Sequence, residues 1–218
     1  GRKRHAVRSG LEQEGQLANN AWSREQPEVI QYFSGLKVKS FSSGNYHNVV
    51  ALEDGTVYTW GSIGPLRIPI LNAFFNDGNC LGLGNVLSAN KPTQIEGLSD
   101  VAQVTAGDRF TLALKNDGRV YGWGSVFGGR LLFQTGVINT PTELVEITRF
   151  LNKKHTHIVK ICSAGSRTVF LCDNGKLYTF GKSEDGNTGH RPNELINEGD
   201  ALDHITPVVD ENFKGQVV

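Results

Sequence analysis

The segment 175–183 contains residue types that bind phosphate, because its two glycines are followed by Lys182 and Ser183. A phosphate-binding loop holds a nucleotide with backbone N–H groups and the lysine, and it requires four residues between the glycines. Here five residues separate Gly175 from Gly181, and they alternate like a β-strand instead of leading into a helix. The spacing therefore argues against a nucleotide site in this segment.

Two histidines stand close enough in the sequence to contact one metal ion. His155 and His157 are separated by one residue, whereas His190 and His204 have no partner nearby. Zinc sites use three or four protein ligands, and no third ligand lies at a useful spacing from this pair. We therefore interpret the pair as part of a solvated loop and expect no metal site.

The cysteines do not form a chemical motif. Cys80, Cys162 and Cys172 are odd in number and include no Cys-x-x-Cys pair, so we expect free thiols instead of a disulfide framework. The sequence also lacks Gly-x-Ser-x-Gly and His-Glu-x-x-His, and Gly82-Leu-Gly84 has no third glycine before a helix. These absences predict a protein without covalent chemistry, without a cofactor and without a small-molecule substrate.

Charge and hydropathy argue against two classes of partner. The 218 residues include 22 Lys+Arg and 22 Asp+Glu, so no net field attracts nucleic acid. The most apolar stretch, 63–75, is interrupted by Pro65, Arg67 and Pro69. Since a membrane-spanning helix needs about 20 apolar residues, we expect no membrane partner.

Three long segments repeat one pattern. They read VKSFSSGNYHNVVALEDGTVYTWG at 38–61, VAQVTAGDRFTLALKNDGRVYGWG at 101–124 and VKICSAGSRTVFLCDNGKLYTFG at 159–181. Each contains a strand, a tight bend, a second strand, an Asp-Gly or Asn-Gly turn and a third strand. Such long repeats are typical of proteins whose units bury their apolar faces only against neighbouring units.

The strand after each turn is apolar on both faces. One face carries Val57, Val120 and Leu177, and the other carries tyrosines followed by Trp60, Trp123 and Phe180. Both faces must therefore be covered, as in sheets stacked against other sheets. We expect the last three side chains in equivalent positions between adjacent sheets.

A further short strand in each unit starts at a proline. Pro27, Pro92, Pro141 and Pro207 precede β-like runs, and proline suits the first residue of a strand. Four strands per unit predict an all-β fold, a β-propeller of about three complete four-stranded blades with partial blades at both ends. The expected division is a tail of a preceding blade at 1–26, blades at 27–91, 92–140 and 141–206, and the start of another at 207–218.

The repeats share the pattern Gly-x-x-His-x-x-x-(Ala/Leu)…Asp-Gly-x-Val-Tyr-x-Trp-Gly. The first repeat carries it at Gly44, His47, Asp54, Gly55, Val57, Tyr58, Trp60 and Gly61. The second carries it at Gly107, Thr111, Ala113, Leu114, Asp117, Gly118, Val120, Tyr121, Trp123 and Gly124, and the third at Gly165, Gly175, Leu177, Tyr178 and Gly181. This pattern resembles the regulator of chromosome condensation repeat. The resemblance implies a seven-bladed propeller, of which this chain supplies a part, with a buried, hydrogen-bonding His47 in its core.

Within that family, the residues around 106–125 and 177–195 resemble exchange factors of Ran-type nuclear GTPases. The resemblance implies that Asp108 is the acidic residue of a catalytic loop. It also implies a wedge against the GTPase, formed by Ser125, Val126, Phe127, Gly128, Gly129 and Arg130. An exchange factor binds the nucleotide-free GTPase more tightly than the loaded one and breaks no bond. The implied function is guanine-nucleotide exchange on a small GTPase in the nucleus.

Three departures leave a second interpretation open. The loop expected to carry a second acidic residue reads Ser166-Arg167, and the wedge is apolar and glycine-rich. The segment 184–210 is acidic, which argues against contact with the acidic patch of histones, although chromatin is a partner of the family. In the alternative, Asp108 caps a turn amide and 125–130 is a connector. The protein would then be a noncatalytic scaffold or adaptor, in the nucleus or the cytoplasm.

Overall fold

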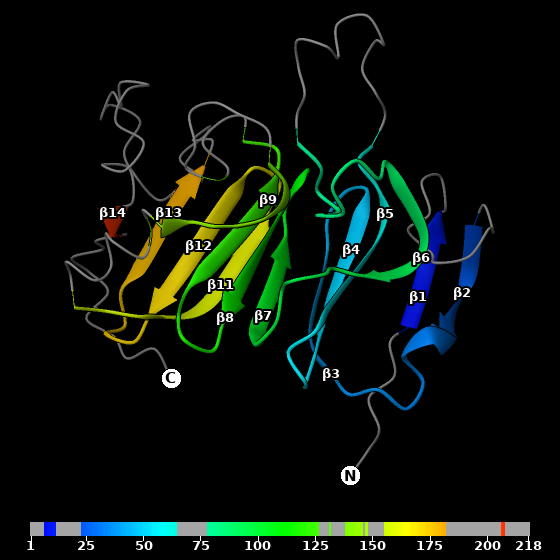
Figure 1. Ribbon diagram of the computed structural model, residues 1–218, viewed down its shortest axis with the longest axis horizontal. Coiled ribbons are helices and arrows are strands. Elements are labelled where there is room, and N and C mark those ends of the chain that lie inside the picture. Colours follow the sequence, from blue (N-terminus) through cyan, green and yellow to red (C-terminus); the bar gives the residue numbers. More distant parts are fainter. Residues whose placement is uncertain are drawn as a thin grey trace, which may run out of the picture.

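The computed structural model describes residues 7–11, 23–64, 78–126, 131, 138–145, 147, 155–181 and 206–207. The chain forms antiparallel sheets that stand side by side, each turned relative to the one before it (Figure 1). This arrangement is that of propeller blades, so the predicted all-β propeller is confirmed.

Three of the sheets have four strands each, in chain order. The first contains β3 (Val38–Ser43), β4 (His47–Leu52), β5 (Val57–Ser62) and β6 (Ser88–Gln94). The second contains β7 (Val101–Ala106), β8 (Phe110–Lys115), β9 (Val120–Gly124) and β10 (Ile138–Glu143). The third contains β11 (Ile158–Ala164), β12 (Arg167–Cys172), β13 (Leu177–Gly181) and β14 (Thr206–Pro207). They are preceded by paired β1 (Val7–Leu11) and β2 (Ser23–Val29), and by the 3-10 turn η1 (Gln31–Phe33).

The strands that contain Pro92 and Pro141 are the last strands of their sheets in chain order, whereas the sequence predicted them to be the first. Pro92 lies within β6 and Pro141 within β10, which pair with β5 and β9 of the repeat before them. Both prolines lie where the register of the ladder shifts. Proline is tolerated at such edge positions and bulges because it has no N–H to donate. The expected boundaries at residues 92, 141 and 207 therefore fall inside edge strands, and the sheets divide the chain one strand later.

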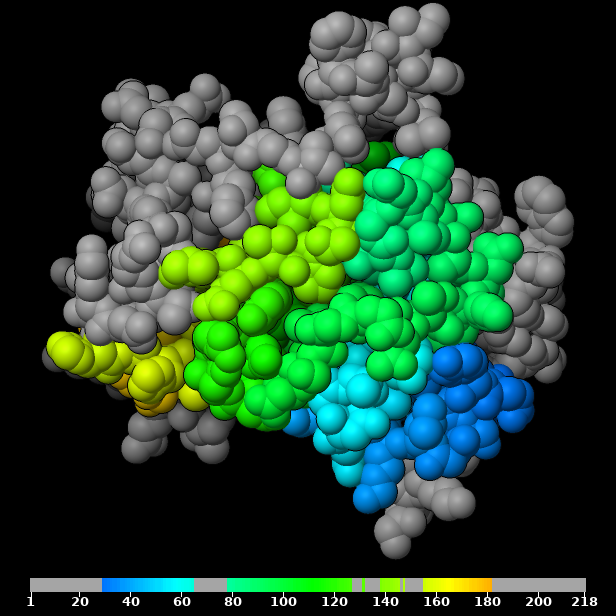
Figure 2. Space-filling view, in the orientation of Figure 1, coloured from blue at the N-terminus to red at the C-terminus, as the bar shows by residue number. Residues whose placement is uncertain are grey.

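Apolar side chains fill the spaces between successive sheets. The cluster between the first and second sheets includes Val49, Val57, Val104 and Trp123. The cluster between the second and third includes Phe110, Leu112, Ile161, Phe170 and Phe180. The cluster on the other side of the first sheet includes Ile30, Phe33, Val50 and Trp60. In the space-filling view the first two sheets, in cyan and green, are in contact across the visible face (Figure 2).

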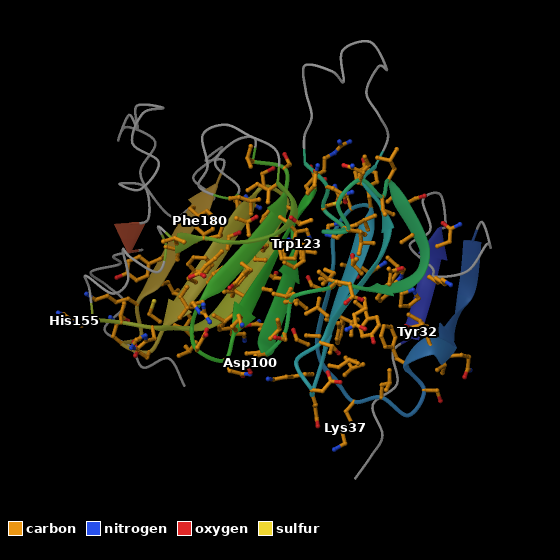
Figure 3. The ribbon with its side chains drawn as sticks, in the orientation of Figure 1. Tyr32, Lys37, Asp100, Trp123, His155 and Phe180 are labelled. Carbon is orange, nitrogen blue, oxygen red and sulfur yellow. The ribbon has the colours of Figure 1, made fainter. Side chains whose placement is uncertain are left out.

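The three large aromatic residues occupy equivalent positions. Trp60, Trp123 and Phe180 are at most 4% exposed and pair across their sheets with Asn48, Thr111 and Thr168. Each packs on the side of its sheet that faces the preceding element of the chain, as Figure 3 shows for Trp123. Neighbouring sheets are therefore held together by the same apolar contact at each interface, and this contact fixes how the ends of the sheets align.

Polar side chains also join the first strands of neighbouring sheets. Ser40 Oγ accepts a hydrogen bond from the N–H of Val104 at 3.1 Å. Two residues further along β3, Ser42 Oγ accepts one from the N–H of Ala106 at 3.0 Å. These bonds align β3 with β7 along their length.

The same ladder continues from the second sheet to the third. The side chain of Gln103 bonds the N–H and the C=O of Ile161, at 2.9 and 2.8 Å, and Thr105 Oγ1 accepts from the N–H of Ser163 at 2.7 Å. Ile161 is therefore the counterpart of Val104. Counting from the bend glycines Gly107 and Gly165 would place Cys162 there, but the register aligns Gly165 with Asp108, since Ala106 pairs with Thr111 and Ser163 with Thr168.

The alternating strand directions separate two ends of the sheets. The bends 44–46, 107–109 and 165–166 follow β3, β7 and β11 and lie together at what we call the bend end. Strands β5, β9 and β13 also end here (Figure 1). The turns that contain Gly55, Gly118 and Gly175 lie at the opposite, turn end.

Candidate functional site

The bend end holds Asp108, the residue expected to carry the activity. Its bend begins at Gly107, whose N–H donates to the carbonyl of Phe110 at 2.9 Å. A Cβ at Gly107 would lie 1.9 Å from the Phe110 ring, so the bend requires glycine at this position. The tight bend leaves the next residue, Asp108, partly exposed.

Asp108 contacts the bends on both sides of its own. Asn45 Nδ2, from the first sheet, donates a hydrogen bond to Asp108 Oδ1. The N–H of Asp108 donates to the carbonyl of Gly165, in the third sheet, at 2.7 Å. The three bends are therefore connected into one row, with Asp108 at its centre.

Arg109, the next residue of the bend, connects Asp108 to two other parts of the site. Its guanidinium lies over the ring of Tyr46, 5.4 Å from the ring centroid. Its carbonyl accepts a hydrogen bond from the N–H of Ser125 at 2.8 Å. A charged guanidinium over an aromatic face is stabilised by the ring quadrupole. The bend thus contacts the preceding bend on one side and the start of the predicted wedge on the other.

The structure describes only the first two residues of the predicted wedge. Ser125 is fully buried, and Val126 is partly buried against the core between the second and third sheets. Gly124, just before them, has φ 104° and lies so close to the bend that a Cβ would be 2.4 Å from the Arg109 carbonyl. The four remaining residues lie outside the described residues: Phe127, Gly128, Gly129 and Arg130.

A buried polar network lies beneath the bends. His47 Nε2 is 2.7 Å from Thr111 Oγ1, and Thr111 Oγ1 donates to the carbonyl of Cys80 at 2.9 Å. The indole N–H of Trp123 donates to the same carbonyl at 2.9 Å. Because the single hydroxyl proton of Thr111 points to Cys80, His47 must donate through Nε2. Its Nδ1 is then an acceptor and is buried without a hydrogen-bond partner.

This network is not suited to acid–base or nucleophilic chemistry. Burial lowers the pKa of His47 from its ordinary value of 6.5 to about 4, so the imidazole is neutral near pH 7. Burial likewise raises the pKa of the Cys80 thiol to about 12, and the nearby Arg109 offsets this only in part. A neutral imidazole and a protonated thiol, both enclosed, hold the blades together. The part played by the Cys80 carbonyl could not be read from the sequence, because a backbone group has no sequence signal.

The two histidines considered as metal ligands, His155 and His157, lie away from this site. Figure 3 shows His155 near the turn end, and the N–H of its neighbour His157 donates to Asp173 Oδ1 at 3.1 Å. Within the described ranges, no three His, Cys, Asp or Glu side chains gather where they could hold a metal ion. In the same ranges, no helix is long and apolar enough to cross a membrane.

Sequence profiles of the regulator of chromosome condensation (RCC1) repeat match residues 54–114 and 38–62. Over 189 residues, 84% of this chain, the sequence is 29% identical to the human regulator of chromosome condensation. The chain belongs to the regulator of chromosome condensation repeat family. Other relatives include the human probable E3 ubiquitin-protein ligase HERC6, 28% identical over 84% of the chain, and the Arabidopsis thaliana ultraviolet-B receptor UVR8, 27% identical over 83%.

Solved structures show the same fold. Prp20p from Saccharomyces cerevisiae superposes with a TM-score of 0.64 at 19% identity, over 87% of this chain and 40% of that one. Human WBSCR16 superposes with a TM-score of 0.65 at 17% identity, over 86% of this chain and 45% of that one. The chain spans 39% of the length of the human regulator, 17% of HERC6 and 36% of UVR8.

Proposed function

We propose that this RCC1-repeat protein is a guanine-nucleotide exchange factor for a Ran-type small GTPase, and that its bend end is the GTPase-binding surface. One observation supports this most. Asp108 presents a carboxylate on a partly exposed bend that both neighbouring sheets hold in place. The start of the predicted wedge is hydrogen-bonded to the same bend through Ser125 and Arg109.

The geometry suits an exchange mechanism without covalent chemistry. A small GTPase holds its nucleotide through the lysine of its phosphate-binding loop and through Mg²⁺. Asp108 competes for these cationic groups, while residues 125–130 press against the same loop. Because the bend is fixed before binding, little ordering entropy is lost when the GTPase docks. The coupling is reciprocal, so incoming nucleotide expels the exchange factor.

The relatives support this proposal, and we infer a compartment from the same likeness. The human regulator of chromosome condensation matches most of this chain. Prp20p, which has the same fold, is described with its binding to Gsp1p and histones. By this likeness the partner is a nuclear GTPase and the site of action is the nucleus, with chromatin as a further partner. The acidic residues within 184–210 disfavour the acidic patch of histones as the point of contact.

A noncatalytic scaffold is the second candidate function, and one feature of the third bend favours it. The counterpart of Asp108 in that bend is Gly165, followed by Ser166, so the next blade supplies no second carboxylate at this position. Relatives of the chain also include a probable E3 ubiquitin-protein ligase and an ultraviolet-B receptor. A scaffold would use the same surface to bind a partner without releasing nucleotide.

Nucleotide release from a Ran-type GTPase loaded with a fluorescent GDP analogue tests the proposal. We expect the chain to accelerate release, and Asp108→Asn to reduce the acceleration roughly tenfold or more, because a charged hydrogen bond to the GTPase is lost. Asp100→Asn is the matched control, since Asp100 also accepts a hydrogen bond from an asparagine but lies at the turn end (Figure 3).

The outcomes separate the two candidates. Equal release rates for Asp108→Asn and the wild-type chain would remove Asp108 from the mechanism. A wild-type chain that binds the GTPase without accelerating release would favour the scaffold. Unfolding temperatures of both variants should stay close to that of the wild-type chain, because both side chains lie at the surface.

A further inference from the structure

Asn45 occupies the bend of the first sheet at the position that Asp108 occupies in the second. Both residues come two positions before the first residue of the following strand, His47 and Phe110, and these pair with Gly61 and Gly124 in the same register. Asn45 donates from its side-chain amide to the carboxylate of Asp108. Equivalent residues of neighbouring bends therefore contact each other directly.

The next pair of bend residues repeats this relationship. Tyr46 follows Asn45 as Arg109 follows Asp108, and the guanidinium of Arg109 lies 5.4 Å from the centroid of the Tyr46 ring. The first bend thus contacts the second through a hydrogen bond and a cation–π contact side by side. Two contacts fix the relative orientation of the bends better than one.

We propose that Asn45 is a positioning residue for Asp108, an inference that rests on the proposed exchange function. The backbone of Asp108 is already fixed by the carbonyl of Gly165, 2.7 Å from its N–H. The amide of Asn45 acts on the side chain instead, because it donates to Oδ1 and thereby favours one rotamer.

The chemistry of asparagine suits this task. A lysine or arginine in its place would also orient the carboxylate, but it would cancel the negative charge that the cationic groups of a GTPase are to meet. The neutral amide donates a hydrogen bond and leaves the charge on Asp108. Asn45 is itself exposed, so its removal leaves no buried polar group unsatisfied.

A double-mutant cycle on nucleotide release from the Ran-type GTPase tests the inference. We expect Asn45→Ala to slow accelerated release roughly fivefold, since an exposed hydrogen bond to a carboxylate is modest in strength. In the Asp108→Ala background, Asn45→Ala should cause no further loss, because Asn45 acts only through Asp108. Asn116→Ala is the matched control: Asn116 donates to Asp100 at the turn end, and its removal should leave release unchanged.

Two results of the cycle would overturn the inference. One is a release rate for Asn45→Ala equal to that of the wild-type chain. The other is a further loss in the Asp108→Ala background as large as in the wild-type chain, which would show that Asn45 acts independently of Asp108.

An NMR measurement decides the positioning role even without a GTPase. Three-bond couplings across χ1 of Asp108 should report one rotamer in the wild-type chain and averaging in Asn45→Ala, while Asn116→Ala keeps the wild-type values. Unchanged couplings in Asn45→Ala would refute positioning by Asn45. If the wild-type chain fails to accelerate release, the proposed function fails, and these couplings alone show whether Asn45 orients Asp108.

Discussion

The loops at the two ends of the sheets are hydrogen-bonded in different ways. At the turn end, each turn is closed by its own side chain. The side chains of Asp54, Asp117 and Asn174 accept from the N–H two residues later, at 2.9, 3.0 and 3.0 Å. At the bend end, the side chain of Asn45 donates to Asp108 in the next sheet, and the N–H of Asp108 donates to Gly165 in the sheet after that.

Under the proposed function, this difference separates residues that shape the repeat from residues that recognise a partner. The turns look alike in all three repeats because each must satisfy its backbone locally. The bends differ, as Asn45-Tyr46, Asp108-Arg109 and Gly165-Ser166, because the ladder between sheets already fixes their position. Side chains at the bend end are therefore the ones that can vary with a partner.

The largest effect is expected at the interface that both ends require. Trp123 is fully buried between the first and second sheets, and Trp123→Ala would remove its packing and its hydrogen bond to Cys80. We expect a loss of about 3–5 kcal/mol in the free energy of unfolding, measured by urea denaturation. A loss of less than about 1 kcal/mol in the free energy of unfolding would show that packing of Trp123 between the sheets does not stabilise the fold on which both ends depend.

Acid should weaken the bend end before the turn end. His47 has a pKa of about 4 in the folded protein and 6.5 when unfolded, so the unfolded state binds the proton first. Stability is therefore full above pH 6.5 and falls as the pH drops towards 4, by about 2 kcal/mol at pH 5. The turn-end carboxylates Asp54, Asp117 and Asp173 have pKa values lowered below 3.8 by hydrogen bonds from Thr56, Arg119 and Thr156. Their stabilisation is lost only below pH 3.8.

Denaturant titrations at several pH values check this order. His47→Gln lacks the titrating group, so its stability, although lower overall, should be flat between pH 6.5 and 4.5. A wild-type chain that is equally stable at pH 7 and pH 5 would contradict a buried neutral His47.

The smallest effect is expected at a single turn. Asp117 is exposed. Its Oδ1 accepts a hydrogen bond from the N–H of Arg119 at 3.0 Å, and its Oδ2 lies 2.7 Å from the Arg119 guanidinium. Because exposed contacts contribute little, Asp117→Ala should lower the free energy of unfolding by less than about 1 kcal/mol. Nucleotide release should not change. A loss of release as large as that of Asp108→Asn would erase the distinction between the two ends.

Much of the fold could be predicted from the sequence, because it depends on patterns that repeat. Apolar residues on both faces of the strands require covered sheets, and the turn glycines mark where strands reverse. The blade boundaries were harder to predict. Pro92 and Pro141 indicate an edge strand, but they do not indicate whether that strand belongs to the preceding or the following sheet. The one-residue shift at Ile161 was hidden for a similar reason, because Gly165 looks like the counterpart of Gly107 in the sequence, although the register aligns it with Asp108.

The site was predictable only in part. The resemblance pointed to Asp108, but its partner Asn45 lies 63 residues away in the chain, and only the packing of the sheets brings the two together. The same holds for the contact between Ser125 and Arg109, which joins a backbone N–H to a backbone carbonyl. Contacts of this kind leave no residue type that sequence reasoning could recognise.

Chemical-shift mapping of the chain with a nucleotide-free Ran-type GTPase tests the central claim most directly. We expect the amide signals of Asn45, Asp108, Arg109 and Ser125 to shift, and those of the turns at Gly55, Gly118 and Gly175 to stay in place. Shifts confined to the turns, with the bend end unchanged, would contradict the assignment of the bend end as the partner-binding surface.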